Sequence, residues 1–205
     1  MVNGFAGKSA RVVMYLLSQA WKKPVSQKQV VEATGLSKGL VSRIMNWLVA
    51  KGAVKRPYRT RFVLEYPEKL LVDWIGQRNI GLKKAFFVDD AAVLKKLKHA
   101  HTLFSGAWLD SSYLRNGITT AYVDKDFIPT RAMHAVEGKV ADFKTKIVLI
   151  PAEDEFIFYA QRKIKGELVV NPFLLYADLA SLGGMGLTAL QQVAEKHGLP
   201  QIFKE

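Results

Sequence analysis

The chain has 205 residues, of which 49% are hydrophobic and 23% charged, with no cysteine and a formal net charge of +12. This is the composition of a globular protein with a buried core, and it excludes disulfides, thiolate metal sites and cysteine nucleophiles. No apolar run is long enough to span a bilayer, and the first residues lack the apolar core of a signal peptide. We therefore expect a cytoplasmic protein with no membrane partner.

The positive charge is concentrated in the first third of the chain. Residues 1–66 contain 12 lysines and arginines against two acidic residues, whereas the remainder contains 18 basic and 16 acidic residues. A concentrated positive field attracts a polyanion and releases counterions from it on binding. Because the excess is local, it favours a nucleic-acid partner over a basic surface that serves only solubility.

The residues from Ser26 to Gly52 are typical of two helices joined by a tight turn. A helix predicted over 8–21 precedes them and cannot continue through Pro24. Ser26 and Ser37 are suited to cap the two helices at their first turns. Gly35 is suited to end the first of them, because glycine adopts the left-handed conformation at little cost. An ordinary helical hairpin is the alternative to a DNA-binding motif.

A basic hairpin is predicted after the second helix, with strands over 53–57 and 61–66 and a turn at 58–60. Three helices followed by two strands is the order of a winged helix-turn-helix. In that fold one helix enters the major groove, and the hairpin meets phosphates or the minor groove. A structural edge with solubilising charges is the alternative. The candidate DNA-binding residues are Lys28, Ser37, Lys38, Gly39, Ser42, Arg43, Asn46, Arg56, Tyr58, Arg59 and Arg61.

Two segments of this region, Leu36–Arg43 and Leu48–Val54, resemble the recognition helix and the start of the wing in MarR-like winged-helix regulators. The resemblance implies double-stranded operator or promoter DNA as the partner. A helix is predicted over 67–75, with proline at its first turn. Residues 77–81 are then suited to be a linker. We therefore expect a winged helix-turn-helix domain over 1–76 and a mixed α/β domain over 82–205, which together make an α+β fold.

In the second half of the chain, segments with the apolar spacing of a helix alternate with segments that have the two-residue alternation of a strand. Helices are expected from Asp89 to about Ala100, within 102–114, and at 172–182 and 187–196, the third of these capped by Asn171. Strands are expected at 84–88, 117–123, 145–150 and 156–160.

Three segments of this half are similar to the C-terminal domain of AbiEi-type antitoxins: Leu103–Leu109, Ile147–Ile150 and Val170–Leu179. This family belongs to AbiE-like (type IV) toxin–antitoxin modules. The resemblance implies an autoregulatory repressor that acts by promoter occlusion and counters a nucleotidyltransferase toxin, directly or functionally. We expect no cofactor.

Two groups of residues could be taken for an active site or a metal site. Asp124 and Asp126 could share a divalent cation in nucleotidyl transfer, but no phosphate-binding turn precedes them, and turn residues are the preferred interpretation. His99 and His101 are two apart, an awkward spacing for metal ligation on the helix expected there. They and the other two histidines are predicted to be surface or packing residues.

We therefore expect no catalytic residue, no metal ligand and no enzyme activity. Asp178, on the apolar helix at 172–182, lies on the exposed face or is held by a partner, and a buried role as a hydrogen-bonded or capping residue is the expectation, with no function assigned. Three alternatives stay open. They are a one-component regulator that responds to a small molecule, a nucleotidyltransferase-type enzyme, and a C-terminal domain that binds a partner protein.

Overall fold

The computed structural model describes residues 7–19, 23–78, 80, 82–88, 91–114, 117–127, 134–135 and 147–203. It is a mixed α+β structure with two compact units. Unit 1 comprises residues 1–78 with 200–205, and unit 2 comprises residues 79–199. The predicted domain limits, 76 and 82, lie on either side of this division, but the last residues group with unit 1. Among the described residues, no helix combines the length and apolar character needed to cross a membrane.

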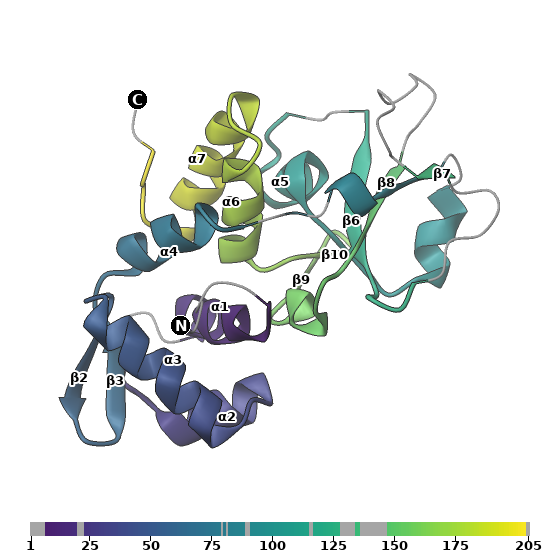
Figure 1. Cartoon of the computed structure of the whole chain (residues 1–205). Helices are drawn as coiled ribbons and strands as arrows, with labels where there is room; N and C mark the ends of the chain where they lie inside the picture. Colours follow the sequence, from purple (N-terminus) through teal and green to yellow (C-terminus); the bar gives the residue numbers. More distant parts are fainter. Residues whose placement is uncertain are drawn as a thin grey trace. The chain divides into compact units, whose positions relative to one another are not determined.

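In unit 1, helices and short strands alternate as shown in Figure 1. The elements are a 3-10 turn η1 (Gly7–Ser9), α1 (Ala10–Gln19), β1 (Val25–Ser26), α2 (Gln27–Thr34), α3 (Lys38–Ala50), β2 (Val54–Tyr58), β3 (Arg61–Leu64) and α4 (Pro67–Ile75). The three strands form an antiparallel sheet with β3 in the middle. Strand β1 was not predicted, and Tyr58 belongs to β2 rather than to the turn.

The predicted caps of α2 and α3 are confirmed. Ser26 accepts a hydrogen bond from the backbone N–H of Gln29, whose side chain bonds back to the Ser26 N–H. This reciprocal pair satisfies two backbone donors that helix geometry leaves free. Gly35 ends α2 at φ 65°, and the Ser37 hydroxyl accepts from the Leu40 N–H at 3.3 Å. Contacts between nearby residues therefore define the end of α2 and the start of each helix.

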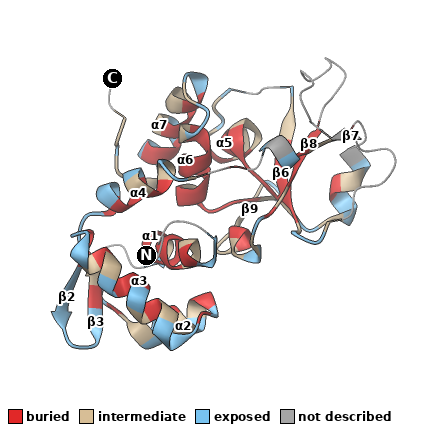
Figure 2. Cartoon of the chain, in the orientation of Figure 1, coloured by how far each residue is buried: buried red, intermediate tan, exposed pale blue. Residues whose placement is uncertain are grey.

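The apolar faces of the unit 1 helices are buried together with the inner face of the hairpin (Figure 2). Val30, Val41 and Leu48 are fully buried, and Phe62 on β3 is 2% exposed. Burying each such side chain contributes about 1.5–3 kcal/mol. The opposite faces of α3 and β2 carry the exposed polar and basic residues.

Unit 2 contains a seven-stranded mixed sheet in the order β7-β4-β8-β6-β5-β10-β9. The strands are β4 (Phe86–Val88), β5 (His99–His101), β6 (Thr119–Val123), β7 (His134–Ala135), β8 (Ile147–Pro151), β9 (Arg162–Ile164) and β10 (Glu167–Val169). The other elements are η2 (Leu82–Lys84), η3 (Ala91–Lys96), α5 (Leu103–Ser111), η4 (Glu155–Phe158), α6 (Pro172–Ala180) and α7 (Met185–His197). Only β6–β8 and β5–β10 pair in parallel among the described strands.

Helices α5, α6 and α7 pack side by side (Figure 1). Seven consecutive residues of α6, 173–179, are buried, so this helix is the centre of the layer. Asp178 lies among them and is fully buried, where it accepts a hydrogen bond from the Thr102 hydroxyl at 2.7 Å. The predicted hydrogen bond of this carboxylate is therefore confirmed. A separate cluster that includes Val88, Leu94 and Leu149 forms part of the unit 2 core.

Two predicted elements of this half are wrong. The helix expected to Ala100 is only a 3-10 helix ending at Lys96, and His99–His101 form strand β5. Pairing with both β6 and β10 satisfies the backbone there, and this outweighs the local helical periodicity. The strand expected at 156–160 is the 3-10 helix η4 instead. Asp154 accepts from the Phe156 N–H, and the Phe156 and Tyr159 rings stack at 4.3 Å, a contact that suits a helical turn.

A buried ionic cluster joins α5, β9 and α7. Asp110 has a fully buried side chain, which pairs with Arg162 at 2.8 Å and accepts from His197 at 2.9 Å. Burial alone would raise the pKa of the Asp110 carboxyl. The hydrogen bond from His197 and the charge of Arg162 outweigh burial, so the pKa of Asp110 lies below its usual range. This carboxylate therefore stabilises the fold in its charged form.

We predict that Asp110→Asn lowers the free energy of unfolding at neutral pH by about 3 kcal/mol, because it removes one partner of a buried pair. The lowered pKa gives the sign of the pH dependence. The stabilisation by Asp110 is complete above the unfolded-state pKa of about 3.9 and is lost as the pH falls through the lower folded-state value. Urea unfolding at several pH values should therefore show the difference between wild type and variant shrinking below about pH 4. Asp126→Asn, at an exposed site, is the control and should change little. A difference in the free energy of unfolding between wild type and Asp110→Asn that stays constant below about pH 4 would contradict this role.

We also predict that Gly186→Ala destabilises unit 2 by about 1–3 kcal/mol, the usual cost of overpacking. A Cβ at Gly186, in the first turn of α7, would lie 2.3 Å from the Leu179 carbonyl oxygen of α6. Gly39 in α3 is the matched control, because a Cβ there would meet nothing within 4 Å. Gly39→Ala should instead stabilise unit 1 slightly. Thermal unfolding of the two variants measures the contrast, and equal effects would refute it.

Candidate nucleic-acid interface

The N-terminal half of α3 presents polar and basic side chains to solvent. Lys38, Arg43 and Asn46 are exposed, and Ser42 is half-buried. Val41, Ile44 and Leu48, on the opposite face of the helix, are buried. One face of α3 therefore packs on the protein, and the opposite face is exposed to solvent.

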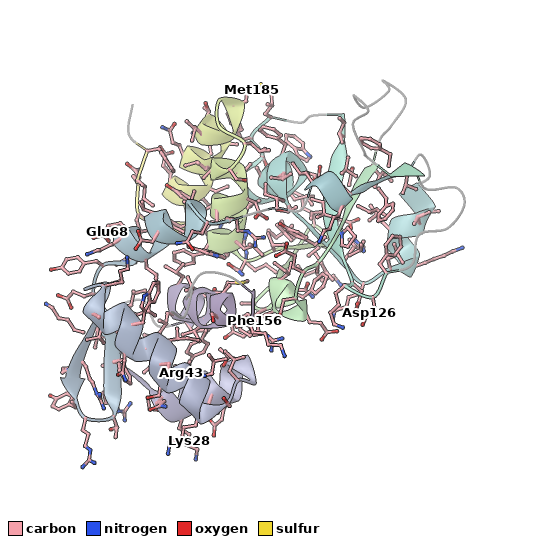
Figure 3. The ribbon with its side chains drawn as sticks, viewed as in Figure 1. Lys28, Arg43, Glu68, Asp126, Phe156 and Met185 are labelled. Carbon is pink, nitrogen blue, oxygen red and sulfur yellow. The ribbon has the colours of Figure 1, made fainter. Side chains whose placement is uncertain are left out.

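Helix α2 supports the start of α3. The Gln27 side chain donates to the Lys38 carbonyl at 2.9 Å, and the Arg11 guanidinium of α1 donates to the Thr34 carbonyl at 3.0 Å. Figure 3 labels Lys28 on α2 and Arg43 on the neighbouring helix α3. Lys28 forms an exposed i,i+4 pair with Glu32 at 3.7 Å, and such a pair is worth little. Its ammonium therefore stays available to an anion.

The hairpin of β2 and β3 is the second basic element of unit 1. The β2 residues from Lys55 to Tyr58 are exposed, as are Arg59, Thr60 and Arg61 at the tip, and Tyr58 retains 70% of its surface. Phe62 and Leu64 of β3 face inward and anchor the hairpin on the core. The hairpin therefore projects a basic edge with one exposed aromatic ring.

Not all of the predicted basic residues are equally available. Arg56 donates from Nε to the Arg59 carbonyl at 3.0 Å, donates again from Nη2, and lies 5.3 Å from the Phe62 ring centre. Its guanidinium therefore braces the hairpin. Lys55, outside the predicted set, pairs with Glu65 at 2.7 Å, and the hydrogen bond and charge of Glu65 raise the pKa of Lys55.

The remaining basic residues of the predicted set are available to a partner. The side chains of Lys38, Arg43, Arg59 and Arg61 form no hydrogen bond or ion pair with other residues in the described part of the chain. The Ser37 hydroxyl is engaged in the α3 cap. Gly39, next to it, is open to solvent with no neighbour that a Cβ would touch, so a ligand could approach this backbone closely.

In unit 2, Asp124 and Asp126 form a turn. The Asp126 N–H donates to the Asp124 carboxylate at 3.0 Å, and Lys125 pairs with Asp126 at 2.7 Å. Each carboxylate is thereby satisfied locally, as the turn interpretation predicts.

The structure brings together a group that the sequence analysis did not assemble, namely His99, His101 and Glu167. Their ligand atoms all lie within 4.8 Å of one another. On a helix, residues two apart point in different directions, whereas on β5 the same spacing puts both imidazoles on one face of the sheet. Glu167 could be found only through the pairing of β10 with β5.

Comparisons of this chain with protein-family models, with curated proteins and with solved structures find no match. The arrangement of its own residues is therefore the basis for a proposal about function.

Proposed function

We propose that this chain is a DNA-binding transcriptional repressor and that unit 1 is a winged helix-turn-helix. One observation carries the proposal: the unpaired basic side chains of Lys38, Arg43, Arg59 and Arg61 project from a short capped helix and from the hairpin that follows it. The unit that holds them has the strongest charge excess of the chain.

The order of the elements supports this assignment. The helices α1, α2 and α3 are followed by β2 and β3, and the β1 strand between α1 and α2 completes a small sheet. In winged helix-turn-helix proteins such an arrangement places the second helix of the motif in the major groove and the hairpin beside the backbone. Here these elements are α3 and β2–β3.

In the proposed complex, α3 enters the major groove with its N-terminal part, from Lys38 to Asn46. Lys38, Ser42, Arg43 and Asn46 reach base edges or phosphates, and Gly39 allows the helix backbone to approach the duplex. Arg59 and Arg61 contact phosphates or the minor groove from the hairpin, while Arg56 holds the hairpin in shape. Binding across a promoter excludes the polymerase, and the protein acts in the cytoplasm.

We predict that Arg43→Ala and Arg59→Ala each weaken binding on all sequences and reduce the slope of log Kobs against log salt by about 1. Each variant removes one cation that releases counterions from DNA. The measurement is a salt-titrated mobility-shift series. Its probes are a duplex from upstream of the coding sequence and an unrelated duplex of equal length.

Lys163→Ala is the matched control, because this exposed lysine belongs to unit 2 and should leave the slope unchanged. Circular dichroism of each variant checks that the fold is kept. If neither Arg43→Ala nor Arg59→Ala changes the slope of log Kobs against log salt, α3 and the hairpin do not form the interface with DNA. A wild-type chain that binds neither duplex at low salt would reject the function itself.

The similarity of unit 2 segments to AbiEi-type antitoxins supports a narrower role for the repressor. We infer that it autoregulates the operon of a toxin–antitoxin module, with a nucleotidyltransferase toxin as its functional partner. Co-expression with a nucleotidyltransferase encoded beside it should restore growth that the toxin alone arrests. Rescue should survive Arg43→Ala if neutralisation belongs to unit 2. If growth stays arrested when the wild-type protein is co-expressed, the antitoxin role is rejected and the repressor proposal is unaffected.

A further inference from the structure

Three side chains of metal-ligand type meet on one face of the unit 2 sheet. His99 and His101 are two residues apart on β5, and alternate residues of a strand point to the same face. The parallel register pairs Val169 with His101, so Glu167 lies beside His99 on β10. The Glu167 Oε2 atom is 3.4 Å from His101 Nε2 and 3.8 Å from His99 Nε2. Three strand positions thus direct one oxygen and two nitrogens at a common point.

The backbone determines the tautomer of His99. Its Nδ1 atom lies 2.9 Å from the Leu97 carbonyl oxygen, which can only accept, so Nδ1 carries the proton. In the neutral ring, Nε2 then holds a lone pair that faces the Glu167 carboxylate. This Nε2 atom is buried and has no hydrogen-bond partner among the described residues. Two acceptors face each other, and a cation between them would relieve the conflict.

The surroundings of His101 hold its ring in place. Its side chain is only 8% exposed, and its Nε2 atom is hydrogen-bonded to Glu167 Oε2 at 3.4 Å. Its Nδ1 atom is buried and has no hydrogen-bond partner among the described residues. A neutral imidazole is the form that coordinates metal ions. A carbonyl that orients the other ring nitrogen, as Leu97 does for His99, is the usual support of a metal-binding histidine.

From this geometry we propose that His99, His101 and Glu167 bind one divalent transition-metal ion, for which Zn²⁺ is the best match. Two imidazoles and one carboxylate suit Zn²⁺, whereas Mg²⁺ and Ca²⁺ take oxygen ligands. Zn–ligand bonds of about 2.0–2.2 Å place tetrahedral ligand atoms about 3.3 Å apart. The His101–Glu167 separation of 3.4 Å is close to this value, and the Glu167 side chain, 53% exposed, has room to adjust toward His99 from 3.8 Å.

The same three side chains line a cavity of about 320 Å³. Three protein ligands leave the fourth position of a tetrahedral ion open, as in catalytic rather than structural zinc sites. Water from the cavity fills that position. Lys95 and Trp108 also line the cavity, and the lysine makes it favourable for a small anionic group that replaces the water.

The test uses the full-length protein after dialysis against chelator. Calorimetric titration with Zn²⁺ at pH 7.5 should show one site per chain. Titration with Co²⁺ should produce the visible absorption of a low-coordinate cobalt ion, and Zn²⁺ should displace it. Mg²⁺ at the same concentration should do neither.

His99→Gln combined with His101→Gln should abolish both signals. Glu167→Gln changes a half-exposed side chain, so the fold should tolerate it. It should weaken Zn²⁺ binding at least about 10-fold, because even the loss of a group that only orients a metal ligand costs about that much affinity. His134→Gln is the control for the histidines, since β7 is separated from β5 by three strands of the sheet. Glu153→Gln, at an exposed position, is the control for the carboxylate.

Two results would overturn the proposal. One is a wild-type chain that binds neither Zn²⁺ nor Co²⁺. The other is binding by the double-histidine variant with wild-type affinity. The Glu167 variant keeps the test decisive if loss of the buried His101 prevents folding. DNA binding does not enter these measurements, so the metal site is tested independently of the repressor.

Discussion

Unit 2 depends on the pairing of β5 with strands on both sides. This three-residue strand lies between β6 and β10, antiparallel to the first and parallel to the second. Thr102 follows it directly and donates to the buried carboxylate of Asp178, which ties the end of the strand to α6. Gly106 allows α5 to pass close to the strand, because a Cβ there would lie 3.2 Å from the His101 carbonyl oxygen. A long-range backbone pairing thus positions the helices and the histidine cluster together.

Unit 1 is organised by a different constraint, which is the separation of a buried apolar core from the exposed basic residues of α3 and the hairpin. The caps at Ser26 and Ser37 and the turn at Gly35 define the ends of α2 and the start of α3, and the buried face of α3 packs on the core of the unit. The hairpin is anchored by Phe62 and Leu64, and its basic residues need no partner within the protein. Net charge alone would not distinguish basic residues that bind a polyanion from basic residues that only keep the protein soluble. The contrast between a braced Arg56 and unpaired arginines on either side of it is more informative, because it separates cations that shape the hairpin from those left for a ligand.

The elements that the sequence predicted well are those specified by nearby residues. Helices α2, α3, α4 and α6 begin or end at serine, glycine, proline or asparagine residues whose side chains or backbone angles define the boundary. The candidate residues of α3 could be named for the same reason, because their exposure follows from helical periodicity. In β2 the exposure does not alternate, since every residue from Lys55 to Tyr58 is exposed. What the sequence could not supply was which of these cations the fold itself uses. The bracing role of Arg56 depends on the geometry of the turn.

The histidine cluster shows where local inference fails, and why. Residues 91–100 have helical spacing of apolar side chains, and on a helix His99 and His101 would point in different directions. In the structure, hydrogen bonds to β6 and β10 convert the last part of this segment into a strand. The same two-residue spacing then places both imidazoles on one face, and Glu167, 66 residues after His101, becomes their neighbour. A two-residue separation of ligands is therefore meaningful only once the secondary structure is known, and here the pairing partners of β5 decide it.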